Sequence, residues 1–218
     1  MRLNGQPIEA GKTYKVAGWA PVNEASKNAG PPVWDVVETW LKANPGKASY
    51  ATLGAGGNTH LLGKMLEEVT GVSMVDVPYK GSGPAMTDLI GGQVQLYFDT
   101  VATSIPMFRE GRIKILGVTS ERRLPGAPDL PTLKEQGVDI TGDTWWGVLG
   151  PAKLPRPIVE RIHSEVVKAV ESEEFRSLIV SRGGVAVSSG TPEEFARFIA
   201  ADTEKWARVI RPLNLQLD

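Results

Sequence analysis

The chain has 218 residues with 24 basic and 25 acidic side chains, two histidines and no cysteine. This composition predicts no nucleic-acid partner, excludes disulfides, thiol catalysis and a histidine-rich metal centre, and gives no reason to expect a metal or a cofactor. Because no apolar run is long enough to cross a membrane and the sequence opens without the apolar core of a signal peptide, we expect no direct membrane insertion.

The first 43 residues are rich in turns and contain one alternating segment and one helical pattern. Residues 14–19 alternate apolar and polar side chains, which predicts a strand. Pro31 and Pro32 then precede a helix expected at 33–43, because prolines favour the start of a helix and Asn44, Pro45 and Gly46 end the pattern. The apolar face of this helix comprises Val33, Val36, Val37, Trp40 and Leu41.

Between residues 47 and 119, short apolar stretches alternate with amphipathic ones. The short stretches predict strands near 48–53, 73–77, 93–98 and 113–119. The amphipathic stretches predict helices near 59–70, 83–90 and 103–110. Such alternation is typical of a largely parallel sheet covered by helices, so the predicted fold class is α/β.

The second half of the chain is expected to be mostly helical. A proline-rich loop at 124–131 leads to a short helix that ends at Gly137. Further helices are predicted at 156–171 and 173–182, and a last one begins at the capping box of Thr191, Pro192 and Glu194. Only the short apolar stretches 148–149 and 185–187 remain to form sheet here, so these helices need something to pack on.

The stretch from Tyr50 to His60 has the pattern of a strand, a glycine-rich turn and a helix start. Glycines at 54, 56 and 57 permit positive φ and let a ligand approach the backbone. Asn58 or Thr59 is expected to cap the helix, whose first turn has unpaired N–H groups and the positive end of the helix dipole. The pattern predicts an anion site, while a capped helix after a loose turn, without a ligand, remains an open alternative.

Polar residues follow each of the first three predicted strands, where parallel sheets gather ligand groups. The predicted ligand-binding set is Thr52, Gly54, Gly56, Gly57, Asn58, Thr59, His60, Tyr79, Lys80, Gly81 and Asp99. Three of these have a second interpretation that spacing does not resolve. His60 can close the cap, Lys80 can be a solvated turn residue, and Asp99 can be the N-cap of the next helix.

From about residue 44 to the end, the chain resembles the solute-binding receptors of tripartite tricarboxylate transporters, the Bug family. The matching residues keep the order and spacing of the family: Tyr50, Gly54, Gly56, His60, Leu61, 77–81, Pro84, Ala85, Asp88, Leu89, 92–94, Phe98, Asp99, Gly111, Val118, Thr119, 128–132, Trp146, Gly147, Pro151, Thr191 and Pro192. One departure is Gly57, where the family usually has a Ser or Thr hydroxyl. Asn58 or Thr59 would have to replace that hydroxyl donor.

The resemblance implies a type II periplasmic binding-protein fold. It makes 44–146 a nearly complete α/β lobe and 147–218 the C-terminal part of the other lobe, whose N-terminal part is missing. It also implies a small carboxylate solute, transporter membrane subunits as partners, no enzymatic activity and a periplasmic location, although a chain without a signal peptide would stay in the cytoplasm. Because the missing part supplies half of the family's carboxylate contacts, we expect weakened binding.

Residues 1–43 resemble the C-terminal end of a periplasmic thiosulfate-oxidation hydrolase of the 5′-nucleotidase superfamily. The matching stretches are 3–7, 14–20, 22–23 and 30–36. The metal ligands of that superfamily lie in another domain, so no metal site is carried over. Two alternatives to a receptor therefore stand: a hydrolase fragment acting on sulfur or phosphate esters, and a non-functional fusion product that self-associates through the apolar surface of its C-terminal helices.

Overall fold

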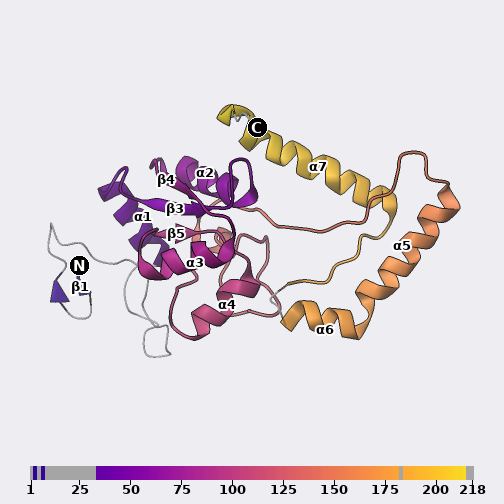
Figure 1. Cartoon of the computed structure of the whole chain (residues 1–218), viewed down its shortest axis with the longest axis horizontal. Coiled ribbons are helices and arrows are strands. Elements are labelled where there is room, and N and C mark those ends of the chain that lie inside the picture. The colour runs from indigo at the N-terminus through magenta and orange to yellow at the C-terminus, as the bar shows by residue number, and fades with distance from the viewer. Residues whose placement is uncertain (1, 4–5, 8–32, 182–183, 215–218) are drawn as a thin grey trace.

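The computed structural model describes residues 2–3, 6–7, 33–181 and 184–214, so the strand predicted at 14–19 and most of the hydrolase-like stretches lie outside the described residues. Figure 1 shows the arrangement of the elements. In chain order they are β1 (Arg2–Leu3), β2 (Gln6–Pro7), α1 (Val33–Ala43), β3 (Ser49–Thr52), α2 (Asn58–Thr70), β4 (Val75–Pro78), α3 (Ser82–Gly91), β5 (Leu96–Tyr97), α4 (Val101–Arg109), η2 (Lys134–Gln136), α5 (Arg156–Glu171), α6 (Glu173–Ser181), α7 (Pro192–Ile210) and η3 (Arg211–Leu213).

The centre of the first half is a parallel sheet in the order β4-β3-β5, as the alternating pattern predicts. β3 pairs with β4 from Ser49 opposite Val75 to Thr52 opposite Pro78, and with β5 through Tyr50 opposite Leu96. Each neighbour is reached through a crossover helix, α2 or α3. The carboxyl ends of the strands therefore lie at one edge of the sheet.

Successive residues of β3 point to opposite faces and build two separate cores. On one face Tyr50 packs in a cluster with α1 and α2, which includes Leu41 and Leu66. On the other face Ala51 packs with Ala85 of α3. Since both faces of β3 are covered, this strand is the interior of the described α/β lobe.

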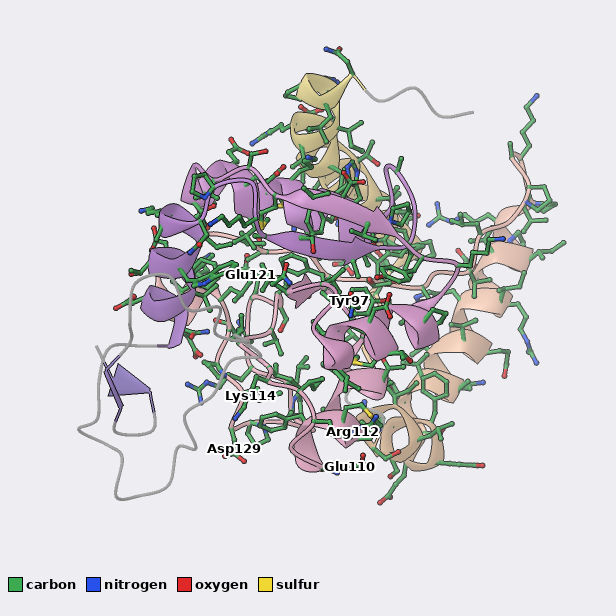
Figure 2. All side chains as sticks on the ribbon, turned by 60° about the vertical axis from the view of Figure 1, so that its left-hand side comes forward. Tyr97, Glu110, Arg112, Lys114, Glu121 and Asp129 are labelled. Atoms are coloured by element: carbon green, nitrogen blue, oxygen red, sulfur yellow. The ribbon has the colours of Figure 1, made fainter. Side chains whose placement is uncertain are left out.

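Two predicted strands are shorter than expected or absent. β5 covers only Leu96–Tyr97 of the predicted 93–98, because the N–H of Gln93 is used to bond the Asp88 carbonyl at the end of α3. The segment predicted as a strand at 113–119 makes a single bridge between Val118 and Thr132. That ladder cannot extend towards Leu116 because its partner contains Pro131, which lacks an N–H donor. Figure 2 shows this segment with Lys114 below the sheet.

The second half of the chain extends away from the sheet (Figure 1). α7 begins at the predicted capping box, where Thr191 Oγ1 accepts a hydrogen bond of 3.1 Å from the Glu194 amide. Trp206 of α7 packs against the Tyr50 core, whereas α5, α6 and α7 themselves contain no buried residue. None of the helices in the described ranges combines the length and the apolar composition that a bilayer span requires.

Gly63 of α2 lies directly against the Tyr50 ring. A Cβ at this glycine would lie 2.0 Å from Cε2 and 2.4 Å from Cζ of Tyr50. Because Tyr50 is completely buried, its ring cannot move away without opening the core. We therefore expect Gly63→Ala to lower the free energy of unfolding by about 1–3 kcal/mol, measured by urea unfolding.

Gly83 of α3 provides the matched control, because a Cβ there meets no atom within 4 Å. Gly83→Ala should leave the free energy of unfolding unchanged or raise it by up to about 1 kcal/mol. Equal losses in both variants would contradict the close contact between Gly63 and Tyr50.

Candidate functional site

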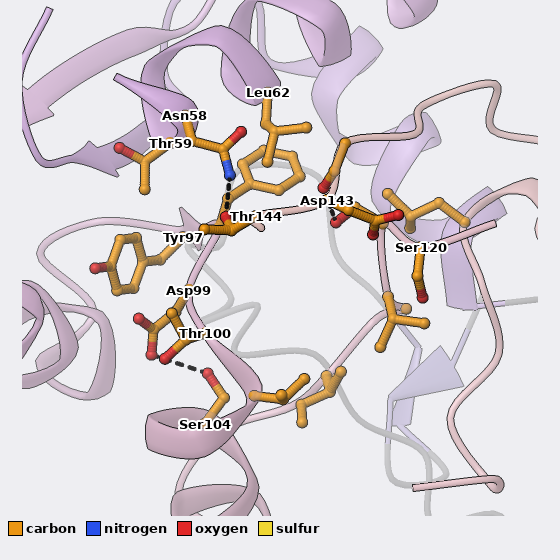
Figure 3. A pocket seen from close by; sticks show the side chains of 18 of the residues that line it. Asn58, Thr59, Leu62, Tyr97, Asp99, Thr100, Ser104, Ser120, Asp143 and Thr144 are labelled. Carbon is orange, nitrogen blue, oxygen red and sulfur yellow. Dashed lines mark hydrogen bonds between the residues drawn. The ribbon is translucent and has the colours of Figure 1, made fainter. Parts of the chain in front are cut away.

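A cavity of about 1930 Å³ extends from the carboxyl edge of the sheet to α1. Its polar part is formed by the starts of α2 and α4, the end of β5 and the segment around residue 143 (Figure 3). Its apolar part reaches α6, α7 and residues 184–187. Of the predicted ligand-binding set, Gly57, Asn58, Thr59 and Asp99 line this cavity.

In the glycine-rich turn, Gly54 and Gly56 have the predicted positive φ, +124° and +74°, whereas Gly57, with φ of −73°, is in an extended conformation. Most N–H groups of the turn are already bonded, however. The Leu53 amide donates to Thr59 Oγ1 at 2.9 Å, the Gly56 amide to His60 Nδ1 at 3.2 Å and the Gly57 amide to the Gly54 carbonyl at 3.3 Å. The turn therefore bonds itself and offers few donors to an anion.

The first turn of α2 retains the donors that the glycine turn lacks. α2 begins at Asn58, and Gly57 is its N-cap without a side-chain cap, so the predicted capping by Asn58 or Thr59 is wrong. Thr59 lies within the helix, and its Oγ1 accepts the Leu53 amide instead of an α2 amide. The amides of Asn58, Thr59 and His60 have no acceptor in the described part of the chain, as expected for the first residues of a helix.

The Asn58 side chain joins α2 to the segment around residue 144 in the cavity lining. Its Nδ2 donates to Thr144 Oγ1 at 3.0 Å, a contact drawn in Figure 3. A hydroxyl has one O–H donor besides its acceptor lone pairs, so the Thr144 proton remains available after this contact. Thr144 thus supplies a hydroxyl donor beside the free amides of α2.

Asp99 lies at the carboxyl end of β5, as predicted, but it is not the N-cap of α4. Thr100 occupies that position. The Asp99 carboxylate accepts hydrogen bonds from the hydroxyls of Thr103 and Ser104 in the first turns of α4, the latter at 3.0 Å. The Asp99 carboxylate is therefore already hydrogen-bonded by side chains at the start of α4.

Seven of the predicted ligand-binding residues do not line the cavity: Thr52, Gly54, Gly56, His60, Tyr79, Lys80 and Gly81. His60 is buried and closes the turn through Nδ1. Tyr79 donates to Asp88 Oδ2 at 2.8 Å, and burial together with this bond raises the pKa of its phenol. Thr52 is buried with its hydroxyl unpaired, and Lys80 is exposed to solvent.

Lys80 does not line the cavity, whose positive charge comes from other residues. Basic side chains of its lining are Lys47, Arg112, Lys114, Arg122, Arg123 and Lys205. Burial lowers the pKa of Lys114 to about 8. Burial raises the pKa of Asp143, which also lines the cavity; Lys205 opposes that shift, and the carboxylates of Glu121 and Asp202 add to it.

Sequence reasoning missed Thr144 and Lys114 because each reaches the cavity through tertiary contacts. Thr144 directly precedes Trp145 and Trp146. The tryptophan pair drew attention to this segment, but nothing in the sequence indicated a role for the Thr144 hydroxyl. Lys114 lies in the segment predicted as a strand, with no pattern to separate it from surface lysines. No group of three metal-ligating side chains comes together among the residues that the structure describes.

Comparison with known proteins identifies the family. The profile of the "Tripartite tricarboxylate transporter family receptor" matches residues 28–215. The chain belongs to this family. The match begins before the boundary expected at residue 44 and takes in α1, while the hydrolase-like character of residues 1–43 stays a prediction.

One relative is the UPF0065 protein in the tcbD-tcbE intergenic region of Pseudomonas sp. strain P51, 35% identical over 78% of this chain and 51% of its own length. Among solved structures, a Rhodopseudomonas palustris protein with adipate has a TM-score of 0.72 at 28% identity, with 85% of this chain and 62% of that chain covered. MatC from R. palustris with bound malate has a TM-score of 0.68 at 25% identity, over 82% and 62%. This chain spans about half the length of most of the curated relatives it matches.

Lys114 leads to a prediction about pH. Its pKa of about 8, against an ordinary 10.5, means that the folded chain binds fewer protons than the unfolded chain between these values. The contribution of Lys114 to stability should therefore be unfavourable below pH 8 and disappear as the pH rises to about 10.5.

NMR titration of the Lys114 ammonium, assigned with Lys114→Arg, should give a midpoint near pH 8 in the native protein. The midpoint should return towards the ordinary value in concentrated urea. A native midpoint above pH 10 would show that the lysine is not desolvated.

Proposed function

We propose that this chain is a solute-binding receptor that holds a small carboxylate at the start of α2. The observation that carries the proposal is the pair of free amides at Asn58 and Thr59, at the polar end of a cavity whose lining includes six basic and four acidic side chains. Carboxylates bind helix starts because the unpaired N–H groups donate to them and the helix dipole adds about 0.3–1 kcal/mol. Two solved relatives that carry adipate and malate support the same ligand class.

We assign a different role to each residue. The Asn58 and Thr59 amides bind one carboxylate group, and the neighbouring Thr144 hydroxyl donates to the same group. Lys114 and the other basic side chains of the cavity offset the charge of a second carboxylate. The hydroxyl bonds of Asp99 within α4 keep its carboxylate from competing for the same donors.

The proposed setting is a tripartite transporter, with membrane subunits as partners and the periplasm as location. The family's description as a transporter receptor supports this assignment. We infer a binding role and no catalysis, because neither described histidine hydrogen-bonds a hydroxyl that it could activate. No observation favours a hydrolase.

Calorimetric titration with malate and adipate tests the proposal. We expect measurable binding weaker than about 1 μM, which corresponds to about −8 kcal/mol, because the chain spans only part of the length of its relatives. Absence of heat with both solutes would reject the receptor function for this chain.

Asn58→Asp separates binding from folding. It places a carboxylate beside the free amides, so we expect at least tenfold weaker binding through repulsion of the anion. Its stability should be unchanged or slightly higher, because acidic residues favour helix starts. Gln93→Glu adds the same charge outside the cavity lining and should change affinity less than twofold. Equal solute affinities for the two variants would show that the solute does not bind at the start of α2.

A further inference from the structure

Asp143 is an acidic side chain of the cavity lining whose hydrogen-bonding capacity is not used within the described part of the chain. Each of the other acidic side chains in the described lining accepts a hydrogen bond: Asp99 from Thr103 and Ser104, Glu121 from Lys134, and Asp202 from Trp145. Asp143 accepts none from any residue that the structure describes. Its carboxylate oxygens are therefore available to a ligand in the cavity.

Two hydrogen bonds between separate segments hold Asp143 in place. The Gly142 amide donates to the Thr119 carbonyl at 3.0 Å, and Thr119 Oγ1 donates to the Gly142 carbonyl at 2.8 Å. Gly142 is buried, and a Cβ there would lie 2.8 Å from Cδ2 of Leu62 in α2. Asp143 and Ser120 directly follow this junction, and both line the cavity (Figure 3).

Acceptors at this junction lie next to the donors of the carboxylate site. Ser120 Oγ donates its proton to the Arg122 carbonyl at 2.7 Å, so only its oxygen lone pairs remain for a ligand. An ionised Asp143 is likewise an acceptor only. The next residue, Thr144, contacts Asn58 at the donor end. Because consecutive Cα atoms are about 3.8 Å apart, one small solute can reach both sets of groups.

The charge of Asp143 is only partly offset by its surroundings. The nearby Lys205 of α7 favours the ionised carboxylate. Burial opposes ionisation more strongly, the carboxylates of Glu121 and Asp202 add to this effect, and the pKa of Asp143 is raised. A carboxylate that has lost part of its hydration gains from a hydroxyl or ammonium donor of a ligand, because a hydrogen bond to an ionised group is a strong one.

We propose that the receptor selects carboxylates that also carry a hydroxyl or ammonium group, and that Asp143 accepts a hydrogen bond from this group. This role of Asp143 rests on the proposed function, because the Asn58 and Thr59 amides bind the carboxylate of the same solute. A solute without the second donor is disfavoured, because the Asp143 acceptor then stays unpaired in the complex. Asp143 is thus a specificity-determining residue.

Malate, aspartate and succinate form a matched series of dicarboxylates with the same carbon chain. Malate carries a hydroxyl, aspartate carries an ammonium group, and succinate carries neither. In calorimetric titration of the full chain, malate, aspartate or both should bind at least about tenfold more tightly than succinate, the effect of one hydrogen bond to a charged group. Equal affinities for all three would overturn the selection and leave the receptor function standing. Absence of binding by all three would reject both.

Two variants of Asp143 distinguish the hydroxyl from the ammonium group. Asp143→Leu removes the acceptor, so the preference over succinate should disappear. Asp143→Asn keeps an acceptor oxygen but not the charge, so a preference for malate should largely remain and a preference for aspartate should be lost. Both variants should fold like the parent chain, because the Asp143 side chain is exposed in the cavity and bonds no described residue.

Asp139→Leu is the matched control. Asp139 is also an exposed aspartate of a non-helical segment, and it lies outside the cavity lining. This variant makes the same change of charge and should alter the preference less than about twofold, because solvent screens a charge outside the cavity. A preference that survives in Asp143→Leu, or that Asp139→Leu removes to the same extent, would overturn the assignment to Asp143.

Discussion

The contact between Tyr50 and Gly63 is the packing constraint on which the described lobe depends. Tyr50 is completely buried in the central strand β3, and the missing side chain of Gly63 lets the α2 backbone lie against its ring. This contact sets the distance between α2 and the sheet. The direction in which the Asn58, Thr59 and His60 amides point follows from that placement, because a helix carries its first N–H groups along its own axis.

The cavity combines groups of opposite charge that serve different purposes. The free amides of α2 and the basic side chains attract an anion, whereas Asp99 would repel one. Bonds from Thr103 and Ser104 satisfy the Asp99 carboxylate within its own helix start. The contact between Asn58 and Thr144 connects α2 to the second half of the chain. A solute bound there would therefore touch both halves of the chain.

The two halves of the chain differ in how much surface they bury. The first half surrounds β3 with two cores, whereas α5, α6 and α7 contain no buried residue. Aromatic contacts of Trp145 and Trp206 connect α7 to the rest, and the outer helices keep their apolar stripes exposed. This imbalance agrees with a chain that spans about half the length of its curated relatives. Because burial of apolar surface is the main favourable contribution to folding, the small buried area of the second half lowers its stability.

The sequence by itself determined the order of helices and strands from residue 33 to 110, the parallel sheet and the glycine turn, because these follow from local periodicity and from φ values that only glycine adopts readily. The family could be named from the same residues. Only the tertiary structure decided which donors stay free: the glycine turn bonds itself, and the helix start does not. It also decided that Thr144 meets Asn58 across 86 residues of sequence and that Lys80 lies outside the cavity that Lys114 lines. Contacts between distant segments depend on how the elements pack, and no local pattern carries that information.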